Sequence, residues 1–105
     1  MPKSVKLGPA ADFPNNACHS FNIEGRRIAI YRVADQFFAT DAICTHAEAD
    51  LTHGTLEGYR IICPLHFAEF DIRTGEALTA PAYTDLEIYA LRVDEEGWVW
   101  IDLPD

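Results

Sequence analysis

Short apolar segments, separated by turns that contain glycine, run through most of this chain. "FNIEGRRIAIY" alternates apolar and polar residues around Gly25, and "TLEGYRIIC" is hinged at Glu57-Gly58. Between them "QFFATDAI" follows a polar break, and after them "EFDIRTGEAL" turns at Thr74-Gly75. Turns at intervals of about eight to twelve residues, with almost no helical periodicity, are typical of an all-β protein. We therefore expect an antiparallel β-sandwich or barrel.

The C-terminal end of the chain predicts a hairpin. "LEIYALRV" and "WVWID" are joined by Asp94 to Gly97, which favour a turn. Trp98 and Trp100 share one face of the last strand because they are two residues apart. We expect both to pack on the sheet rather than to form a binding platform. Alternation in the preceding strand sets three residues on one face, opposite three others: Leu86, Ile88 and Ala90 against Glu87, Tyr89 and Leu91.

The composition excludes several classes of protein. With 105 residues, we expect one domain, residues 1–105, around a modest core. No apolar run approaches the roughly 18 residues of a membrane helix, and the N-terminus lacks an apolar signal region. We therefore expect a cytoplasmic protein that does not bind membranes. The net charge of −9 argues against nucleic acid as a partner. Three cysteines, an odd number, disfavour a disulfide framework.

Two pairs of soft metal ligands lie close together in the sequence. Cys44 and His46 are separated by one residue, Cys63 and His66 by two, and sixteen residues lie between the pairs. Each pair follows an expected strand, so two loops side by side would form one metal site. One tetrahedral zinc ion would accept these four ligands. A binuclear iron centre, with both cysteines on one iron and both histidines on the other, suits the mixed loops better.

The motif Cys44-x-His46 … Cys63-Pro64-x-His66 resembles the Rieske [2Fe–2S] signature. The resemblance continues through "FDIRTGEAL" to "TAPAY", which contains Pro81 and is similar to the proline loop that covers the cluster in Rieske proteins. It implies the Rieske fold, with a small cluster-binding part over roughly residues 42–82 that is formed by two loops. It also implies one Rieske-type [2Fe–2S] cluster, for which the metal ligands would be Cys44, His46, Cys63 and His66.

The resemblance extends to ferredoxins that consist of a lone Rieske domain. It implies a one-electron carrier, not an enzyme, that takes electrons from a flavin-dependent ferredoxin reductase. The electrons would pass to the terminal oxygenase of a bacterial aromatic-ring hydroxylating dioxygenase system. An alternative is the small Rieske-like subunit of a larger redox enzyme such as nitrite reductase. The oxygenase itself would need a second iron site with two histidines, and only His19 and His53 remain. We expect a monomer.

Several positions depart from the high-potential respiratory Rieske proteins. Those proteins have a disulfide between the two loops, and Ala49 and Leu65 stand at the matching positions. They also have two hydroxyls that hydrogen-bond the cluster sulfurs, where this chain has Ala68 and Phe70. Fewer hydrogen bonds stabilise the reduced cluster less. We therefore expect a reduction potential near the low end of the Rieske range, roughly −150 mV.

Phe67 follows the second ligand histidine, where many members of the family have glycine. Because a phenylalanine at positive φ would be strained, we expect that the turn differs or that φ is negative. Phe67 would then be either a lid on the cluster loop or a docking contact.

The remaining reactive side chains have simpler interpretations. We expect Cys18 to be a small buried hydrophobe, His19 a strand or surface residue, and His53 part of a loop surface. The acidic residues would mostly keep the surface solvated. Three near the loops would instead steer a basic partner: Glu48, Asp50 and Glu69.

Overall fold

The computed structural model describes residues 3–44, 49–65, 67–79 and 84–103. Within these ranges the chain forms two antiparallel sheets and two single 3-10 turns, η1 (Ala10–Asp12) and η2 (Leu51–His53). The larger sheet has the order β1-β9-β8-β4-β3-β2 and consists of β1 (Lys3–Pro9), β2 (Ala17–Ile23), β3 (Arg26–Val33), β4 (Gln36–Asp41), β8 (Ile88–Val93) and β9 (Trp98–Leu103). The smaller sheet has the order β5-β6-β7 and consists of β5 (Thr55–Glu57), β6 (Arg60–Ile62) and β7 (Glu69–Asp71).

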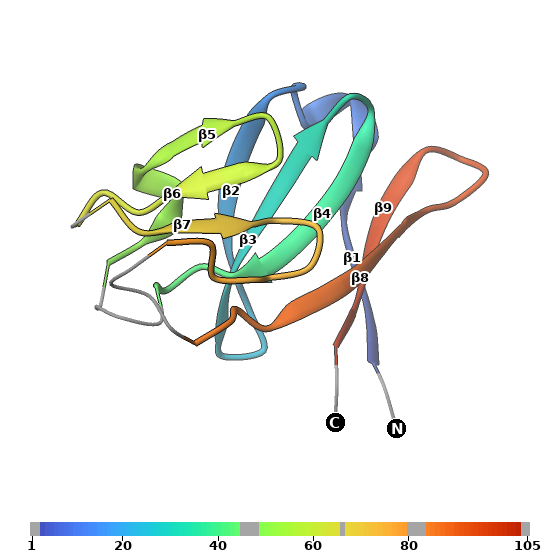
Figure 1. Cartoon of the computed structure of the whole chain (residues 1–105). Helices are drawn as coiled ribbons and strands as arrows, with labels where there is room; N and C mark the ends of the chain where they lie inside the picture. Colours follow the sequence, from blue (N-terminus) through green and yellow to red (C-terminus); the bar gives the residue numbers. More distant parts are fainter. Residues whose placement is uncertain (1–2, 45–48, 66, 80–83, 104–105) are drawn as a thin grey trace.

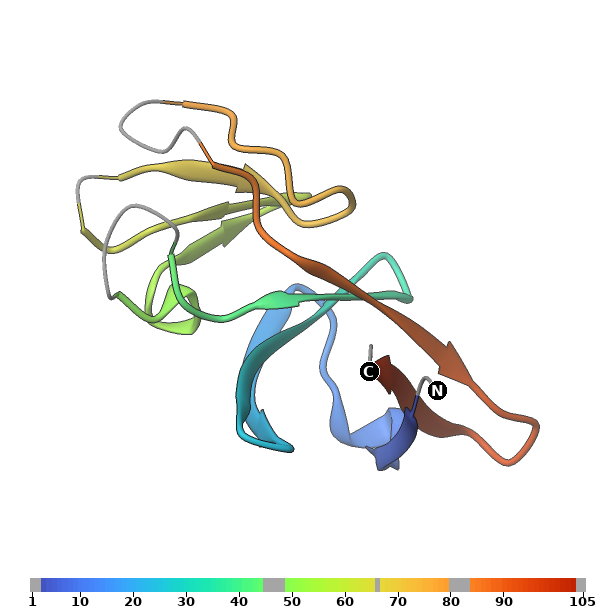
Figure 2. The same cartoon turned by 90° about the horizontal axis from the view of Figure 1, so that it is seen from below.

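The strands of the smaller sheet come between β4 and β8 in the sequence, whereas β4 and β8 are neighbours in the larger sheet. The smaller sheet therefore lies inside the segment, residues 42–82, that the sequence assigned to the cluster-binding part. Figures 1 and 2 show it beside one end of the larger sheet, with the β8–β9 hairpin at the other end. The expectation of an antiparallel all-β fold with a small second part is confirmed. Across the part of the chain that is described, no helix is long and apolar enough to cross a membrane.

Strand β3 is buried on both faces and separates two cores. Ala29 and Tyr31 point into the core that lies under the smaller sheet. Ile28 and Ile30 point into a second core, against β1 and β9. Successive side chains of a strand alternate between its faces, so one strand can serve both cores. The unbroken apolar run "IAIY" in the sequence reflects this double burial.

The C-terminal hairpin keeps the expected alternation, and the structure shows which face is inward. Tyr89 is only 7% exposed and faces the core, whereas Ile88, on the opposite face of the strand, is 47% exposed. The polar tip of Tyr89 decides this, because its hydroxyl donates to Asp41 and accepts from Arg26 at the sheet surface. Strand β1, which the sequence analysis did not anticipate, pairs with β9 through a register shift between Lys6 and Gly8.

The two tryptophans of β9 lie on the outer face of the larger sheet. Both are half-buried, and the Lys6 ammonium stands 4.3 Å from the ring centroid of Trp98 and 5.5 Å from that of Trp100. The Trp100 indole N–H donates to Asp94 at 2.8 Å. The prediction that these rings pack on the sheet is confirmed.

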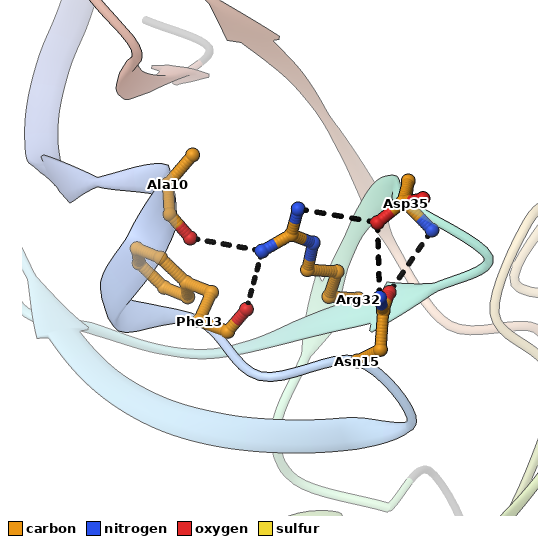
Figure 3. A network of polar contacts seen from close by, with 5 residues as sticks. All are labelled: Ala10, Phe13, Asn15, Arg32 and Asp35. Atoms are coloured by element: carbon orange, nitrogen blue, oxygen red, sulfur yellow. Dashed lines mark hydrogen bonds and ion pairs between the residues drawn. The ribbon is translucent and has the colours of Figure 1, made fainter.

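Arg32 ties the segment before β2 to the β3–β4 turn. One guanidinium nitrogen donates to the carbonyls of Ala10, at 3.0 Å, and Phe13, at 2.7 Å (Figure 3). The other terminal nitrogen meets Asp35 at 3.3 Å, and Asn15 in turn donates to Asp35 at 2.9 Å. The planar fork of arginine meets all three acceptors at once, which a lysine ammonium could not do with the same geometry.

We predict that Arg32→Met lowers the free energy of unfolding by about 2 kcal/mol, because the Phe13 carbonyl loses its donor and the Ala10 carbonyl keeps only the Phe13 N–H. Chemical denaturation followed by circular dichroism would measure the change. Arg92→Met is the matched control, since Arg92 is exposed and only stacks on Trp100, 5.1 Å from the ring centroid. If both variants lose the same free energy of unfolding, the hydrogen bonds of Arg32 to its three acceptors do not stabilise the fold.

Candidate metal centre

The two cysteines begin loops that are closed in the same way. Cys44 follows β4, and its N–H donates to the carbonyl of Ala49 at 2.9 Å. Cys63 follows β6, and its N–H donates to the carbonyl of Ala68 at 2.7 Å. In both loops the cysteine N–H bonds to the carbonyl five residues later, although the spacing between cysteine and histidine differs. Figure 1 shows the β6–β7 loop at the end of the molecule opposite the β8–β9 hairpin.

Both thiols are buried in the same core. Cys44 is 4% exposed and Cys63 is 0% exposed, and neither is in a disulfide. Burial, together with the neighbouring Cys44 thiol, raises the pKa of Cys63 to about 11. Two thiols side by side in an apolar core fit a metal centre, because a bound cation would displace their protons and compensate the two thiolates. The donor set therefore fits the sulfur side of an iron–sulfur cluster.

The other two expected ligands, His46 and His66, lie outside the described residues, as does Pro81. The four-ligand set is consequently not assembled in what can be described. Among the residues that are described, no group of three or more His, Cys, Asp or Glu side chains forms a metal site. The sequence prediction for the histidines stays a prediction.

The positions that lack polar groups in this chain surround the thiols. Ala68 and Phe70 are both 0% exposed and belong to the same core as the two cysteines. Ala49 is also buried there, whereas Leu65 is 48% exposed. The core around the two thiols thus offers methyl groups and a phenyl ring where a hydroxyl could have been accommodated.

An ion pair that the sequence analysis missed anchors the first loop. Asp50 pairs with Ile43 in an isolated β-bridge at the base of that loop. Its carboxylate accepts from the Thr52 N–H at 2.9 Å and from the Arg27 Nε at 3.0 Å, and its side chain is 10% exposed. Burial alone would raise the pKa of Asp50, but these hydrogen bonds and the Arg27 charge lower it below its usual value. The pair therefore fastens the first loop to the start of β3.

The same observations bear on the carboxylates that were expected to steer a partner. Asp50 is committed to Arg27, and Glu69 forms an ion pair with Arg60, which also contacts Glu57 at 3.1 Å. Asp50 is therefore paired within the chain, whereas Arg60 is shared between two carboxylates, and the steering of a basic partner by Asp50 and Glu69 stays a prediction. Glu48 lies outside the described residues.

We predict that Asp50→Ala lowers the free energy of unfolding by about 1–2 kcal/mol and speeds loss of the cofactor in denaturant, because Thr52 and Arg27 lose their acceptor. Asp50→Asn should cost less, since an amide oxygen still accepts from Thr52. The folded-state pKa of Asp50 is lowered, so its contribution is complete above pH about 4 and is lost only as pH falls further.

Asp35→Ala is the control for the Asp50 variants, because Asp35 is an exposed partner of Arg32 away from the loops. Bleaching of the cofactor absorbance in urea would compare the proteins. If Asp50→Ala bleaches no faster than Asp35→Ala, the Arg27 pair does not anchor the loop.

Phe67 has a conformation that the sequence analysis did not expect. Its φ is +57°, in the left-handed region, so the prediction of a turn with negative φ is wrong. Phe67 thus adopts the conformation that a glycine would favour, because the loop closes back on Cys63 through the next residue, Ala68. Such a residue costs roughly 1–2 kcal/mol of backbone strain. The side chain is 73% exposed, which does not fit a lid packed on the loop.

The leftover reactive side chains have structural roles. Cys18 is half-buried at the edge of the core and its thiol donates to the Thr52 carbonyl at 3.8 Å. Burial raises the pKa of this thiol, as expected for a small hydrophobe. His19 lies on β2 with its ring edge toward Phe13, and its Nε2 is buried with no partner in the described chain. His53 is exposed at the end of η2, as predicted.

Comparison with known proteins places this geometry in a family. The Rieske [2Fe-2S] domain matches residues 3–90. The chain belongs to this family. The ferredoxin component of the naphthalene 1,2-dioxygenase system of Pseudomonas aeruginosa is 38% identical over 88% of this chain and 88% of the relative. A solved structure described as a complex of reduced oxygenase and oxidized ferredoxin in carbazole 1,9a-dioxygenase contains a chain with 36% identity and a TM-score of 0.88, covering 93% of this chain and 91% of that one.

A third similarity concerns the alternative considered from the sequence. A putative NADH-dependent nitrite reductase small subunit from Mycobacterium tuberculosis has a TM-score of 0.89 over the whole of this chain and 98% of its own. Its sequence identity is only 14%, so this likeness shows the fold alone. The predicted Rieske fold and the Rieske-type [2Fe–2S] cluster are confirmed by the family.

We predict that hydroxyls placed beside the thiols raise the reduction potential. Ala68→Ser and Phe70→Tyr would each add a donor within the cysteine-containing core. The charged reduced state gains more from such a bond than the oxidised state, by about 1 kcal/mol, and about 1.4 kcal/mol corresponds to ~59 mV for one electron. Each variant should therefore shift the potential upward by about 40 mV.

Ala39→Ser is the control for these hydroxyls, because Ala39 is 2% exposed in the other core. Protein-film voltammetry would measure all the variants. If the variants keep their cofactor and match the parent potential, the missing hydroxyls do not set it.

Proposed function

We propose that this chain is a one-electron carrier, a Rieske-type ferredoxin of an aromatic-ring hydroxylating dioxygenase system. It receives electrons from a flavin-dependent ferredoxin reductase and delivers them to a terminal oxygenase. The observation that carries the proposal is the pair of adjacent buried thiols at one end of a small β domain. The relative in the naphthalene system supports it, because that protein is named as the ferredoxin component.

The cluster is held by four residues in the proposed site. Cys44 and Cys63 would hold one iron of the cluster, in keeping with their burial. His46 and His66 would hold the other iron, and a solvent-facing imidazole would give the electron its way in and out. The whole of residues 1–105 acts as one domain, and the protein works as a monomer in the cytoplasm.

The two partners are supported unequally. The similar chain in the carbazole 1,9a-dioxygenase complex supports a terminal oxygenase as the electron acceptor. The reductase follows from the role of a carrier, which must be reduced before it can deliver an electron. No contact or residue favours the nitrite reductase alternative, since the likeness to that subunit extends to the fold alone.

Reconstitution would test the function. The purified protein, a ferredoxin reductase and NADH should reduce a terminal oxygenase only when all three are present. Failure to reduce any oxygenase of this class, by a protein that carries its cluster and is itself reduced, would contradict the proposed role. Copurification with a large redox subunit in fixed stoichiometry would instead favour the accessory-subunit alternative.

We predict that the purified protein contains two irons and two acid-labile sulfides per chain, with Rieske-type absorbance. Cys44→Ser and Cys63→Ser should abolish cluster assembly, because a thiolate is the stronger anchor. His46→Cys and His66→Cys should retain a cluster with the spectrum of an all-thiolate centre. Cys18→Ser is the matched control and should keep the parent spectrum. An unchanged spectrum in any of the four ligand variants would show that the ligand is wrong, and stoichiometric zinc would exclude the cluster.

A further inference from the structure

Phe67 combines two costs that a glycine at the same position would avoid. Its side chain is 73% exposed, the highest value among the exposed large hydrophobics of the described chain. Its backbone lies in the left-handed region, at φ +57°. Glycine would remove both costs at once. A strained, exposed aromatic residue that does not stabilise the fold points to a role in function.

The other strained residues of the described chain differ from Phe67. Glu24 lies in the β2–β3 turn, Ala34 and Asp35 form the β3–β4 turn, and Asn16 precedes β2. Their side chains are small or polar, and the hairpin turns need positive φ for their own twist. Phe67 is the one apolar aromatic among them, and it lies between Cys63 and the start of β7.

Exposed apolar side chains collect near the two cysteines. Of the six large hydrophobics that are exposed, Ile43 precedes Cys44, and Leu65 and Phe67 lie in the second loop. Leu78 is held beside β7, because its N–H donates to the Glu69 carbonyl at 2.8 Å. We call these four residues, Ile43, Leu65, Phe67 and Leu78, the apolar tip. The nearby carboxylates that are described, Asp50 and Glu69, each form an ion pair with an arginine, and Glu69 shares Arg60 with Glu57.

We infer that Phe67 is the apolar anchor through which this ferredoxin docks on its terminal oxygenase, inserting into an apolar recess of the oxygenase surface. The inference rests on the proposed function and adds to it the residue that selects the partner. An aromatic ring gives a large buried area at low entropic cost, and such residues dominate the free energy of protein interfaces. The left-handed backbone orients the ring outward next to the second loop's ligand position. Electron transfer then needs no steering by Asp50 or Glu69.

The test compares variants at position 67 with two controls. Phe67→Gly and Phe67→Asn both suit positive φ and remove the ring, whereas Phe67→Tyr keeps it. Ala34→Gly relieves strain at φ +51° in a turn away from the loops. Val93→Thr makes an exposed apolar residue polar on the β8–β9 hairpin, at the opposite end of the molecule (Figure 1). All proteins are used as full chains with their cluster.

Stability and electron transfer should move in opposite directions. The midpoint of thermal unfolding of Phe67→Asn should equal or exceed the parent value by a few degrees. The KM of the oxygenase for this ferredoxin should rise about tenfold or more in Phe67→Gly and Phe67→Asn, with kcat and the reduction potential unchanged. Because Phe67→Tyr keeps the ring, its KM should stay within about threefold of the parent value. The two controls should stay within about twofold.

Two further measurements separate the alternatives. An apolar anchor predicts that the ratio of variant to parent KM is the same at about 50 mM and about 500 mM salt; a ratio that collapses at high salt would overturn the inference in favour of electrostatic docking. Reduction of the ferredoxin by its reductase is followed separately. A loss confined to that step would overturn the assignment to the oxygenase. If the parent protein delivers electrons and the KM of Phe67→Gly and Phe67→Asn equals that of the parent, the inference is overturned but the proposed function stays intact.

Discussion

Burial of β3 on both faces is the constraint on which the rest of the structure depends. Ala29, Tyr31 and Val33 pack into the core that contains Cys44 and Cys63. Ile28 and Ile30 pack on the opposite face, into the core against β1 and β9. Tyr31 is fully buried in the first core, and its hydroxyl pairs with that of Thr40 at 3.0 Å, so neither polar group lacks a partner. The cysteine-bearing loops thus rest on a strand that is fixed from behind by a second core.

The loops are held mainly by backbone contacts and by one charged pair. The Cys44 and Cys63 N–H groups close their loops on Ala49 and Ala68, and these bonds need no particular side chain. The Arg27–Asp50 pair adds the link to the larger sheet. Because the carboxylate is largely buried and hydrogen-bonded to Thr52 as well, this pair is stronger than an exposed ion pair would be. The base of the site is therefore held independently of the side chains at its outer end.

The second loop has an apolar side toward the metal centre and an apolar side toward the solvent, where we propose that the partner docks. The buried side of the second loop is apolar and closely packed, with Ala68 and Phe70 fully buried. Its outer side carries Leu65 and Phe67, which are 48% and 73% exposed. An apolar interior limits hydrogen bonds to the cluster and favours a low potential, whereas an apolar exterior favours contact with another protein. Both properties follow from side chains within a few residues of Cys63.

The sequence by itself determined most of the strands and their turns, and the two loops that each carry one cysteine. These are local signals: alternation, glycine at hinges, and soft ligands at fixed spacing. Tertiary structure alone decided the rest. Tyr89 faces inward because Asp41 and Arg26 lie where its hydroxyl emerges. Phe67 is left-handed because the loop must close on Cys63, and Asp50 binds Arg27 because β3 passes under the first loop. Contacts between residues far apart in the chain set the outcomes for Tyr89 and Asp50, and the closure of a whole loop sets that for Phe67, so none of them follows from the alternation of apolar and polar residues.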